Sequence, residues 1–485
     1  MNKDIGTFVL SILIAPVFGI LFSLYALQLV AMSDPEGGGM TAIVRWCAEN
    51  HDARMYCHAL REFTLLKSLS FVALVATILL PLTYTVILLS LSGNRAALAR
   101  GYPLLVRICL AVLPFILVAH AILIAFIAWE AIEYRFWHPS AFLLFAIVAV
   151  VGALLLAAFN ILTDMRQMLA VEPLRVTGIA VDESRAPDLH ARARRIAQKL
   201  GAAAPRHIVV GIEPMVFMTS IPVRLRGVGD VPEGETLYVS TLALRTLDDT
   251  ELDGLLAYEI AHFTGSDLAF SRRFAPAQAA LANAVDSVDE DVSESVFMRI
   301  AKAPAYGLLS LMLLVLRWRM RQVHVDREAA ADQAALGFAP ALRMIPMIIK
   351  MTVLGSQWLE FRRGLTDLMN RGIGRRNIAR DYLQRLRDHL GKADAGKLRF
   401  ELSQMTTPHP LDPHLSLGMR AASIGIDDKN LIAPTVIALR QEQPEKPVLV
   451  AIEEEVTKAD LDYTRVPGHP IKLEETVDLP KELTA

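Results

Sequence analysis

Cysteine is scarce in this sequence and unevenly placed. The 485 residues include three cysteines, Cys47, Cys57 and Cys109, and none follows Cys109. The long C-terminal part therefore has neither a disulfide framework nor a thiolate metal site. Cys47 and Cys57 share one hydrophilic segment. They form a disulfide if that segment faces an oxidising compartment, and are otherwise two free thiols.

A strong net charge is also missing. The formal net charge is -2 at pH 7, so the chain lacks the basic excess that marks proteins binding nucleic acid. The sequence contains no zinc-finger, P-loop or dinucleotide-binding fingerprint either. We therefore expect no nucleic acid among the partners.

Four long stretches contain no Asp, Glu, Lys or Arg, although the chain as a whole is 21% charged. Each is long enough to cross a bilayer as a helix. They predict a four-span α-helical membrane domain over residues 1–163, with the lipid bilayer as a partner. A transporter or channel is disfavoured because no span carries a charged residue. The stretches are residues 8–32, 68–92, 108–128 and 140–163.

The basic residues between the spans predict the orientation. Arg95, Arg100 and Arg107 lie between the second and third stretches with no acid among them, whereas the segment 33–67 mixes bases with acids. Because cytoplasmic loops are enriched in Lys and Arg, we expect the loop 33–67 to face outside. An even number of spans then places both chain ends in the cytoplasm, and we expect the membrane to be a bacterial inner membrane.

Residues 164–440 have the pattern of an α+β, mostly helical domain. We expect a helix at 188–200, strands at 207–211, 217–225 and 236–240, and further helices at 247–263, 310–336 and much of 341–390. Thr250 is the expected cap of the helix 247–263. The apolar stretch 303–316 is too short for a fifth span. The charged, proline-containing tail 441–485 is expected to be loosely ordered.

One helical segment carries part of a zinc-binding pattern. In H-E-x-x-H, two histidines four residues apart share a helix face and bind one zinc ion, and the glutamate lies beside the water that the ion activates. The segment here is Tyr258-Glu259-Ile260-Ala261-His262, in which tyrosine stands in place of the first histidine. Alone, E-x-x-H is common, and a buried helix face is the better explanation for it.

Two further segments supply polar groups of the right kind. Glu328 and Asp332 are four residues apart on the second long helix, so one can bind a metal while the other orients a ligand. His409 and His414 belong to a polar, proline-containing turn, where a histidine could stabilise a developing oxyanion. Taken separately, a solvated helix and an exposed loop explain both segments.

Together these residues resemble the membrane-anchored zinc metallopeptidases of the HtpX and CAAX prenyl-endopeptidase kind. The resemblance covers about residues 173–425. It rests on the strand 236–240, the helix 255–263, Asp267 with residues 271–274, the E-x-x-x-D at Glu328, and the late histidine turn with Arg420. It implies a zincin-like metallopeptidase domain, which the orientation expected from the basic residues places in the cytoplasm.

The resemblance also implies roles for individual residues. His262 and Glu328 would be ligands of one zinc ion and Glu259 the general base, with Asp332 behind the ligands and His409 and His414 beside the reacting group. An extended polypeptide substrate or client would lie along an edge strand, for which residues 217–225 are the candidate.

The departure from the family is Tyr258. A phenol binds metal well only after losing its proton, so Tyr258 is either a phenolate ligand or a hydrogen-bond partner of Asp332 in a site that binds zinc weakly. Two hypotheses follow: a zinc-dependent endopeptidase that acts on membrane or misfolded proteins, and a non-catalytic pseudopeptidase that binds or organises membrane proteins. The oligomeric state is not predicted.

Overall fold

The computed structural model describes residues 2–32, 39–49, 54–134, 140–168, 173–265, 268, 270–289, 296–392, 415–426, 429–441, 447–464 and 472–474. The chain divides into two compact units. The first comprises residues 1–171 and 277–320, and the second comprises residues 172–276 and 321–485. The expected boundary at residue 163 thus lies close to the observed one, but residues 277–320 group with the first unit.

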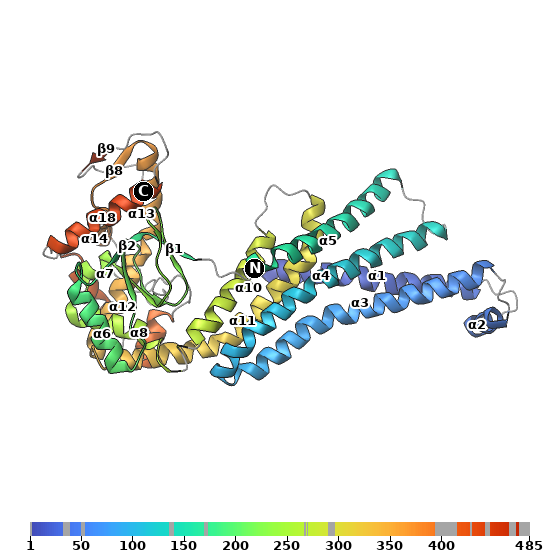
Figure 1. Cartoon of the computed structure of the whole chain (residues 1–485), viewed down its shortest axis with the longest axis horizontal. Helices are drawn as coiled ribbons and strands as arrows, with labels where there is room; N and C mark the ends of the chain where they lie inside the picture. Colours follow the sequence, from blue (N-terminus) through green and yellow to red (C-terminus); the bar gives the residue numbers. More distant parts are fainter. Residues whose placement is uncertain are drawn as a thin grey trace. The chain divides into compact units, whose positions relative to one another are not determined.

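The first unit is built from long apolar helices (Figure 1). The helix α1 packs on α3, α3 on α4, and α4 on α5. Four helical segments are long and apolar enough to cross a membrane, which confirms the four predicted spans at the level of length and composition. The helices are α1 (Asn2–Met32), α3 (Arg54–Ser92), α4 (Arg95–Glu133) and α5 (Ala141–Met168), and the candidate spans are Leu13–Met32, Cys57–Ser92, Ala96–Glu133 and Ala141–Thr163.

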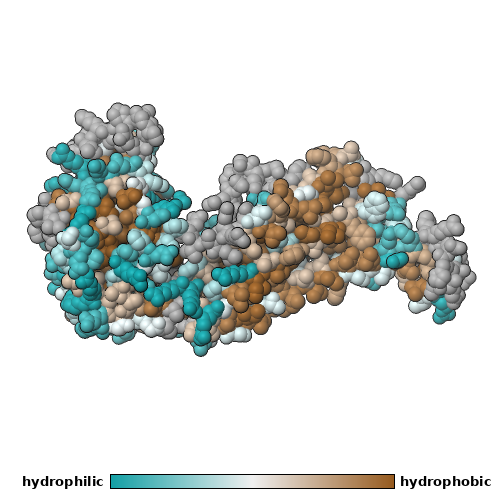
Figure 2. All heavy atoms as spheres, viewed as in Figure 1, coloured by the Kyte–Doolittle hydropathy of each residue, from teal (hydrophilic) through white to brown (hydrophobic). Residues whose placement is uncertain are grey.

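The outer surface of these helices is apolar. On the face seen in Figure 2, hydrophobic side chains gather over the first unit. Phe71, Phe115 and Phe142 are examples of large apolar side chains that are mostly exposed. Contiguous apolar surface of this kind is costly in water, and lipid is the solvent that it fits.

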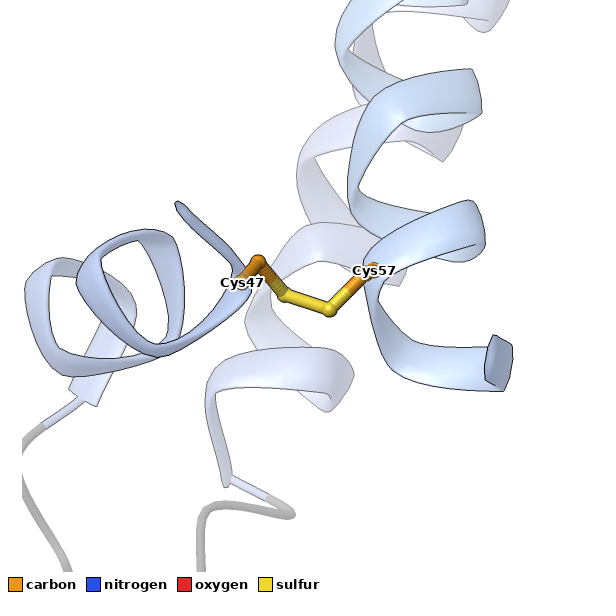
Figure 3. Close-up of a disulfide and its surroundings, with 2 residues drawn as sticks. All are labelled: Cys47 and Cys57. Atoms are coloured by element: carbon orange, nitrogen blue, oxygen red, sulfur yellow. A yellow bond between two sulfur atoms is a disulfide. The ribbon is translucent and has the colours of Figure 1, made fainter. Parts of the chain in front are cut away.

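The cysteine pair of the first unit forms a disulfide. A short helix, α2 (Gly39–Glu49), lies between α1 and α3, and the Cys47–Cys57 bridge joins it to the beginning of α3 (Figure 3). The sequence left open whether Cys47 and Cys57 are free thiols or a disulfide, and in the structure they form a disulfide. Cys109 is a buried free thiol.

The second unit contains short sheets and many helices. A four-stranded sheet has the order β2-β3-β7-β4, in which β3 and β7 are parallel and the outer pairs are antiparallel. The strands β3 and β7 coincide with the predicted strands 207–211 and 236–240. The strands are β2 (Gly178–Val181), β3 (His207–Gly211), β4 (Val216–Thr219) and β7 (Thr236–Ser240).

The predicted strand 217–225 is two strands in different sheets. Its first part belongs to β4, and its last part is β5 (Val223–Leu225), which pairs with β1 (Leu174–Val176) and β6 (Gly229–Asp230). Pro222 stands between them and has no backbone N–H for a sheet ladder, which accounts for the interruption. Phe217, Val223 and Tyr238 pack together beneath these strands.

Helices cover the four-stranded sheet and enclose the main core, among them α6 (Pro187–Leu200), α8 (Asp249–Ala261) and α12 (Ala341–Ser356). The helix α6 confirms the prediction at 188–200. It begins with Pro187 and ends at Gly201, whose φ of 64° suits glycine. The remaining helices of this unit are α7 (Thr241–Thr246), the π-helix η1 (Phe270–Phe274), α13 (Trp358–Asn370), α14 (Ile378–Lys392), α16 (Leu417–Ser423), α17 (Lys429–Leu439) and α18 (Pro447–Thr464).

The start of α8 is held by several charged groups. Asp248, and not the predicted Thr250, caps the helix: its side chain accepts from the Glu251 N–H, and the Glu251 carboxylate accepts from the Asp248 N–H. Two bases from α12 reinforce this capping box. Lys350 donates to Glu251 at 2.6 Å, and Arg343 donates to Asp248 at 3.0 Å.

Part of the expected tail is an ordered helix. Residues 447–464 form α18, which packs against β2 and β3, so the prediction of a loosely ordered segment is wrong for these residues. Its buried charges have partners: Glu453 pairs with Arg245, and Asp460 pairs with Arg362. The last described strand, β9 (Lys472–Glu474), pairs with β8 (Ile373–Arg375).

The helices α10 (Ala275–Asp289) and α11 (Val296–Ala335) belong to both units. Residues 303–316 form part of α11, within the portion that groups with the first unit. The last part of α11, from Arg321 onward, belongs to the second unit and carries Glu328 and Asp332.

Candidate metal centre

Two helices of the second unit bring the predicted site residues together. The helix α8 carries Tyr258 and Glu259, and His262 follows its last residue. The last part of α11 carries Glu328 and Asp332. All of these side chains except His262 are less than 9% exposed, and His262 is 12% exposed. Such a concentration of buried acids and polar groups is unusual in a protein core and requires specific partners.

The Tyr258 side chain contacts the Glu328 side chain. Its hydroxyl donates a hydrogen bond to Oε2 of Glu328. The rings of Tyr258 and His262 meet edge to face, with centroids 5.3 Å apart. The expectation that Tyr258 hydrogen-bonds Asp332 is therefore wrong. The carboxylate that the resemblance assigns as the third zinc ligand is the one that the tyrosine holds.

His262 and Glu328 are placed as two ligands of one ion would be. Nε2 of His262 lies 3.4 Å from Oε1 of Glu328. Two ligand atoms at the usual bond lengths of a tetrahedral zinc ion are about 3.4 Å apart. The spacing also fits an ion pair if the imidazole is protonated, so it is compatible with a metal and does not require one.

Asp332 holds a buried arginine. Nε of Arg420, on α16, lies 3.2 Å from both oxygens of Asp332. The guanidinium carbon of Arg420 is 4.1 Å from the centre of the Tyr258 ring, a cation–π contact. The sequence named Arg420 within the resemblance but gave it no role, because residues 88 positions apart carry no spacing signal.

The environment keeps the Tyr258 phenol neutral. Burial raises the pKa of Tyr258 well above its ordinary value. The Arg420 cation opposes this rise, and the charges of Glu328, Glu259 and Asp332 add to it. A phenol that keeps its proton donates to Glu328 and is a poor metal ligand.

The described residues fit zinc only in part. His262 and Glu328 supply two protein ligands, and the Tyr258 hydroxyl is engaged as a donor. Within the described portion of the second unit, no third His, Cys, Asp or Glu joins these two at ligand distance. A zinc peptidase needs three protein ligands and an open position. The predicted residues His409 and His414 lie outside the described residues, as does Asp267.

The sheet places a strand beside the candidate site. β4 is an outer strand of the four-stranded sheet and packs against α8. Of the predicted substrate strand 217–225, the part within β4 therefore lies next to the helix that carries Tyr258 and Glu259. An outer strand can pair with an extended polypeptide through its backbone.

Comparisons with known proteins do not assign the chain to a family. No protein-family model matches the chain, and no solved structure matches it. The features of the chain that bear on its function are therefore the side chains of α8, α11 and α16 and the apolar helices of the first unit.

Proposed function

We propose that this chain is a membrane-anchored, zincin-like pseudopeptidase, a non-catalytic protein that binds polypeptide segments at the membrane. The observation that carries the proposal is the hydrogen bond from Tyr258 to Glu328. It engages Oε2 of the carboxylate whose Oε1 faces His262, and it keeps the phenol a hydrogen-bond donor instead of a metal ligand. In addition, Tyr258 stands where the resemblance implies a histidine, so one imidazole ligand is missing.

The side-chain contacts of the site lower its affinity for a metal ion. A buried hydrogen bond to a charged acceptor contributes about 1.5–3 kcal/mol, and a metal ion that displaced Tyr258 from Oε2 of Glu328 would have to offset this amount. Arg420 places a further positive charge against the Tyr258 ring, where it opposes a second cation. Zinc binding at this site is therefore expected to be weak.

The binding role rests on β4 and α8. The strand ends its sheet next to the helix that carries the candidate site, and its four residues are buried, so the edge becomes available to a partner only when its cover moves. A bound segment in extended form would add a strand to this edge, with main-chain hydrogen bonds supplying affinity. Catalysis is not needed for such binding, and the polypeptide would be released uncleaved.

The second candidate function is a zinc-dependent endopeptidase, and the spacing of His262 and Glu328 favours it. Their ligand atoms are 3.4 Å apart, which suits two ligands of one zinc ion. Glu259 is buried on the same helix. In that case it would be the general base of the hydrolysis.

We also propose the orientation expected from the sequence, in a bacterial inner membrane. The Cys47–Cys57 disulfide supports it, since disulfides persist in oxidising compartments. Residues 33–67 then face outside, and the second unit, with the candidate site, faces the cytoplasm.

Four proteins distinguish the two functions: wild type, Tyr258→His, Glu259→Gln and the double variant. Each would be purified in detergent with added zinc, and cleavage of an unfolded membrane substrate and capture of the same substrate would be measured in parallel. Glu259→Gln is the matched control because it keeps size and polarity but removes the base.

The pseudopeptidase predicts that wild type and Glu259→Gln capture substrate equally and cleave it only at background level. The endopeptidase predicts wild-type cleavage above that of Glu259→Gln by about 10²–10⁴-fold. Cleavage gained in Tyr258→His and lost in the double variant would identify Tyr258 as the block to catalysis. Absence of capture by wild type would reject the binding role.

A further inference from the structure

A second group of potential metal ligands lies in the first unit and includes none of the residues of the candidate metal centre. The helices α3 and α4 are joined by a two-residue turn, Gly93-Asn94, and pack along each other. The beginning of α3 therefore lies beside the end of α4. This arrangement brings together His58 and Glu62 of α3 with Glu133 of α4.

These three side chains have metal-ligand spacing. One ligand atom from each of His58, Glu62 and Glu133 lies within 4.8 Å of the others. Nδ1 of His58 is 3.0 Å from Oε2 of Glu62, and the Tyr134 hydroxyl donates to the same oxygen at 3.0 Å. His58 and Glu133 are exposed, so both can adjust their rotamers around an ion that arrives from water.

Glu130 is the independent observation that points to a ligand. Its side chain is completely buried, and no donor among the described residues reaches either carboxylate oxygen; the side chain within hydrogen-bonding reach is another carboxylate, that of Glu62. The charged groups that act on it are two more acids, Glu62 and Glu133. The same three carboxylates also act on the Tyr134 phenol, so they converge on one place.

A buried carboxylate beside two other acids needs a positive charge or a proton. Within the described residues, no lysine or arginine pairs with Glu62, Glu130 or Glu133, and His58 is the basic group nearby. A divalent cation would attract all three carboxylates at once and neutralise two of their three negative charges. A mixed set of one imidazole and several carboxylates suits zinc and similar first-row ions.

We propose that His58, Glu62, Glu130 and Glu133 form a divalent-cation site, with zinc as its ion, at the end of the membrane unit that carries the disulfide. The ion would fasten α3 to α4, while the neighbouring Cys47–Cys57 bridge fastens α2 to α3. This site is independent of the proposed function, because it uses none of the residues of α8, α11 or α16.

The test is zinc binding by the full chain in detergent with its disulfide intact, measured by competition with a chromophoric chelator. Wild type, Glu133→Gln and His58→Gln are compared, with His262→Gln as the control for the other candidate centre. We expect wild type to bind zinc. Each of the first two variants should bind at least about tenfold more weakly, since even outer-shell changes cost about 10–100-fold. His262→Gln should retain wild-type affinity at this site.

Glu133 and His58 are exposed, so these variants should fold, and a thermal shift provides a second readout. Added zinc should raise the unfolding temperature of wild type and leave that of Glu133→Gln unchanged. Equal zinc affinity in wild type, Glu133→Gln and His58→Gln would overturn the proposal. So would an absence of zinc binding, which would leave a proton as the neutralising charge on Glu130. Loss confined to His262→Gln would assign the zinc to the other centre and equally reject this site.

Discussion

Tyr258 and Glu328 join the two helices of the candidate site, because the tyrosine hydroxyl donates directly to the glutamate carboxylate. In a zinc peptidase of the kind that the sequence resembles, a metal ion would make this connection between helices. Here a hydrogen bond between side chains makes it, and Arg420 covers the tyrosine ring. The first two predictions test how much these contacts stabilise the second unit.

Tyr258→Phe should destabilise the protein by about 1.5–3 kcal/mol, because Glu328 loses a donor while it stays buried. Urea unfolding in detergent, followed by tryptophan fluorescence, would measure the change. Tyr463→Phe is the matched control, since Tyr463 is 49% exposed, and it should change stability by less than about 0.5 kcal/mol. Equal stabilities of Tyr258→Phe and wild type would show that the hydrogen bond contributes nothing.

Arg420→Met should destabilise the second unit by about 3–5 kcal/mol, because it leaves Asp332 buried without its cation. The double variant Arg420→Met with Asp332→Leu should lose less stability than the single variant, since no uncompensated charge remains. Unfolding in urea tests both. A double variant as unstable as the sum of its two single variants would contradict a direct pairing.

Glu453→Ala should destabilise the protein by a similar amount. Its carboxylate is fully buried, pairs with Arg245 and accepts from Asn377 at 2.8 Å, so the variant strands an arginine in the core. Glu455→Ala, two residues along α18, is the control: Glu455 is about half exposed and pairs with Arg185 at the surface. If the two variants had equal stabilities, the buried pair of Glu453 and Arg245 would not anchor α18.

Thiol labelling tests the orientation. After reduction in intact cells, a membrane-impermeant maleimide should label Cys47 and Cys57, because the loop that holds them is proposed to face outside. Buried Cys109 should stay unlabelled. A Cys47→Ser, Cys57→Ser variant supplies the background. Labelling that appears only after lysis would reverse the proposed orientation.

The sequence predicted those parts of the fold that depend on local pattern. Uncharged runs identified the four long apolar helices, and β-branched runs identified β3 and β7, because both signals are properties of consecutive residues. The tail was misjudged for the opposite reason. The charges of α18 suggested a solvated segment, whereas Glu453 and Asp460 are buried against Arg245 and Arg362, which are far away in the sequence.

In the candidate site, too, the sequence predicted the local features but not the contacts between distant residues. The i, i+4 spacing placed Tyr258 with His262 and Glu328 with Asp332 on their helix faces. It could not show which residue of one helix contacts which residue of the other, so it gave Tyr258 the wrong carboxylate. The sequence pattern did not indicate the cluster of His58, Glu62, Glu130 and Glu133, because these residues come together only when α3 and α4 pack against each other.

The contacts that anchor the start of α8 explain why the candidate site can lose a metal ligand while the second unit stays folded. Its first turn is secured by a capping box and by Lys350 and Arg343, so the helix does not rely on a metal to keep its place. Small zinc domains unfold when their ion is removed, whereas here a chelator should leave the second unit folded. Exchange of a metal ligand at position 258 would then change the chemistry of the site without unfolding the second unit, and the scaffold would remain free to serve another purpose.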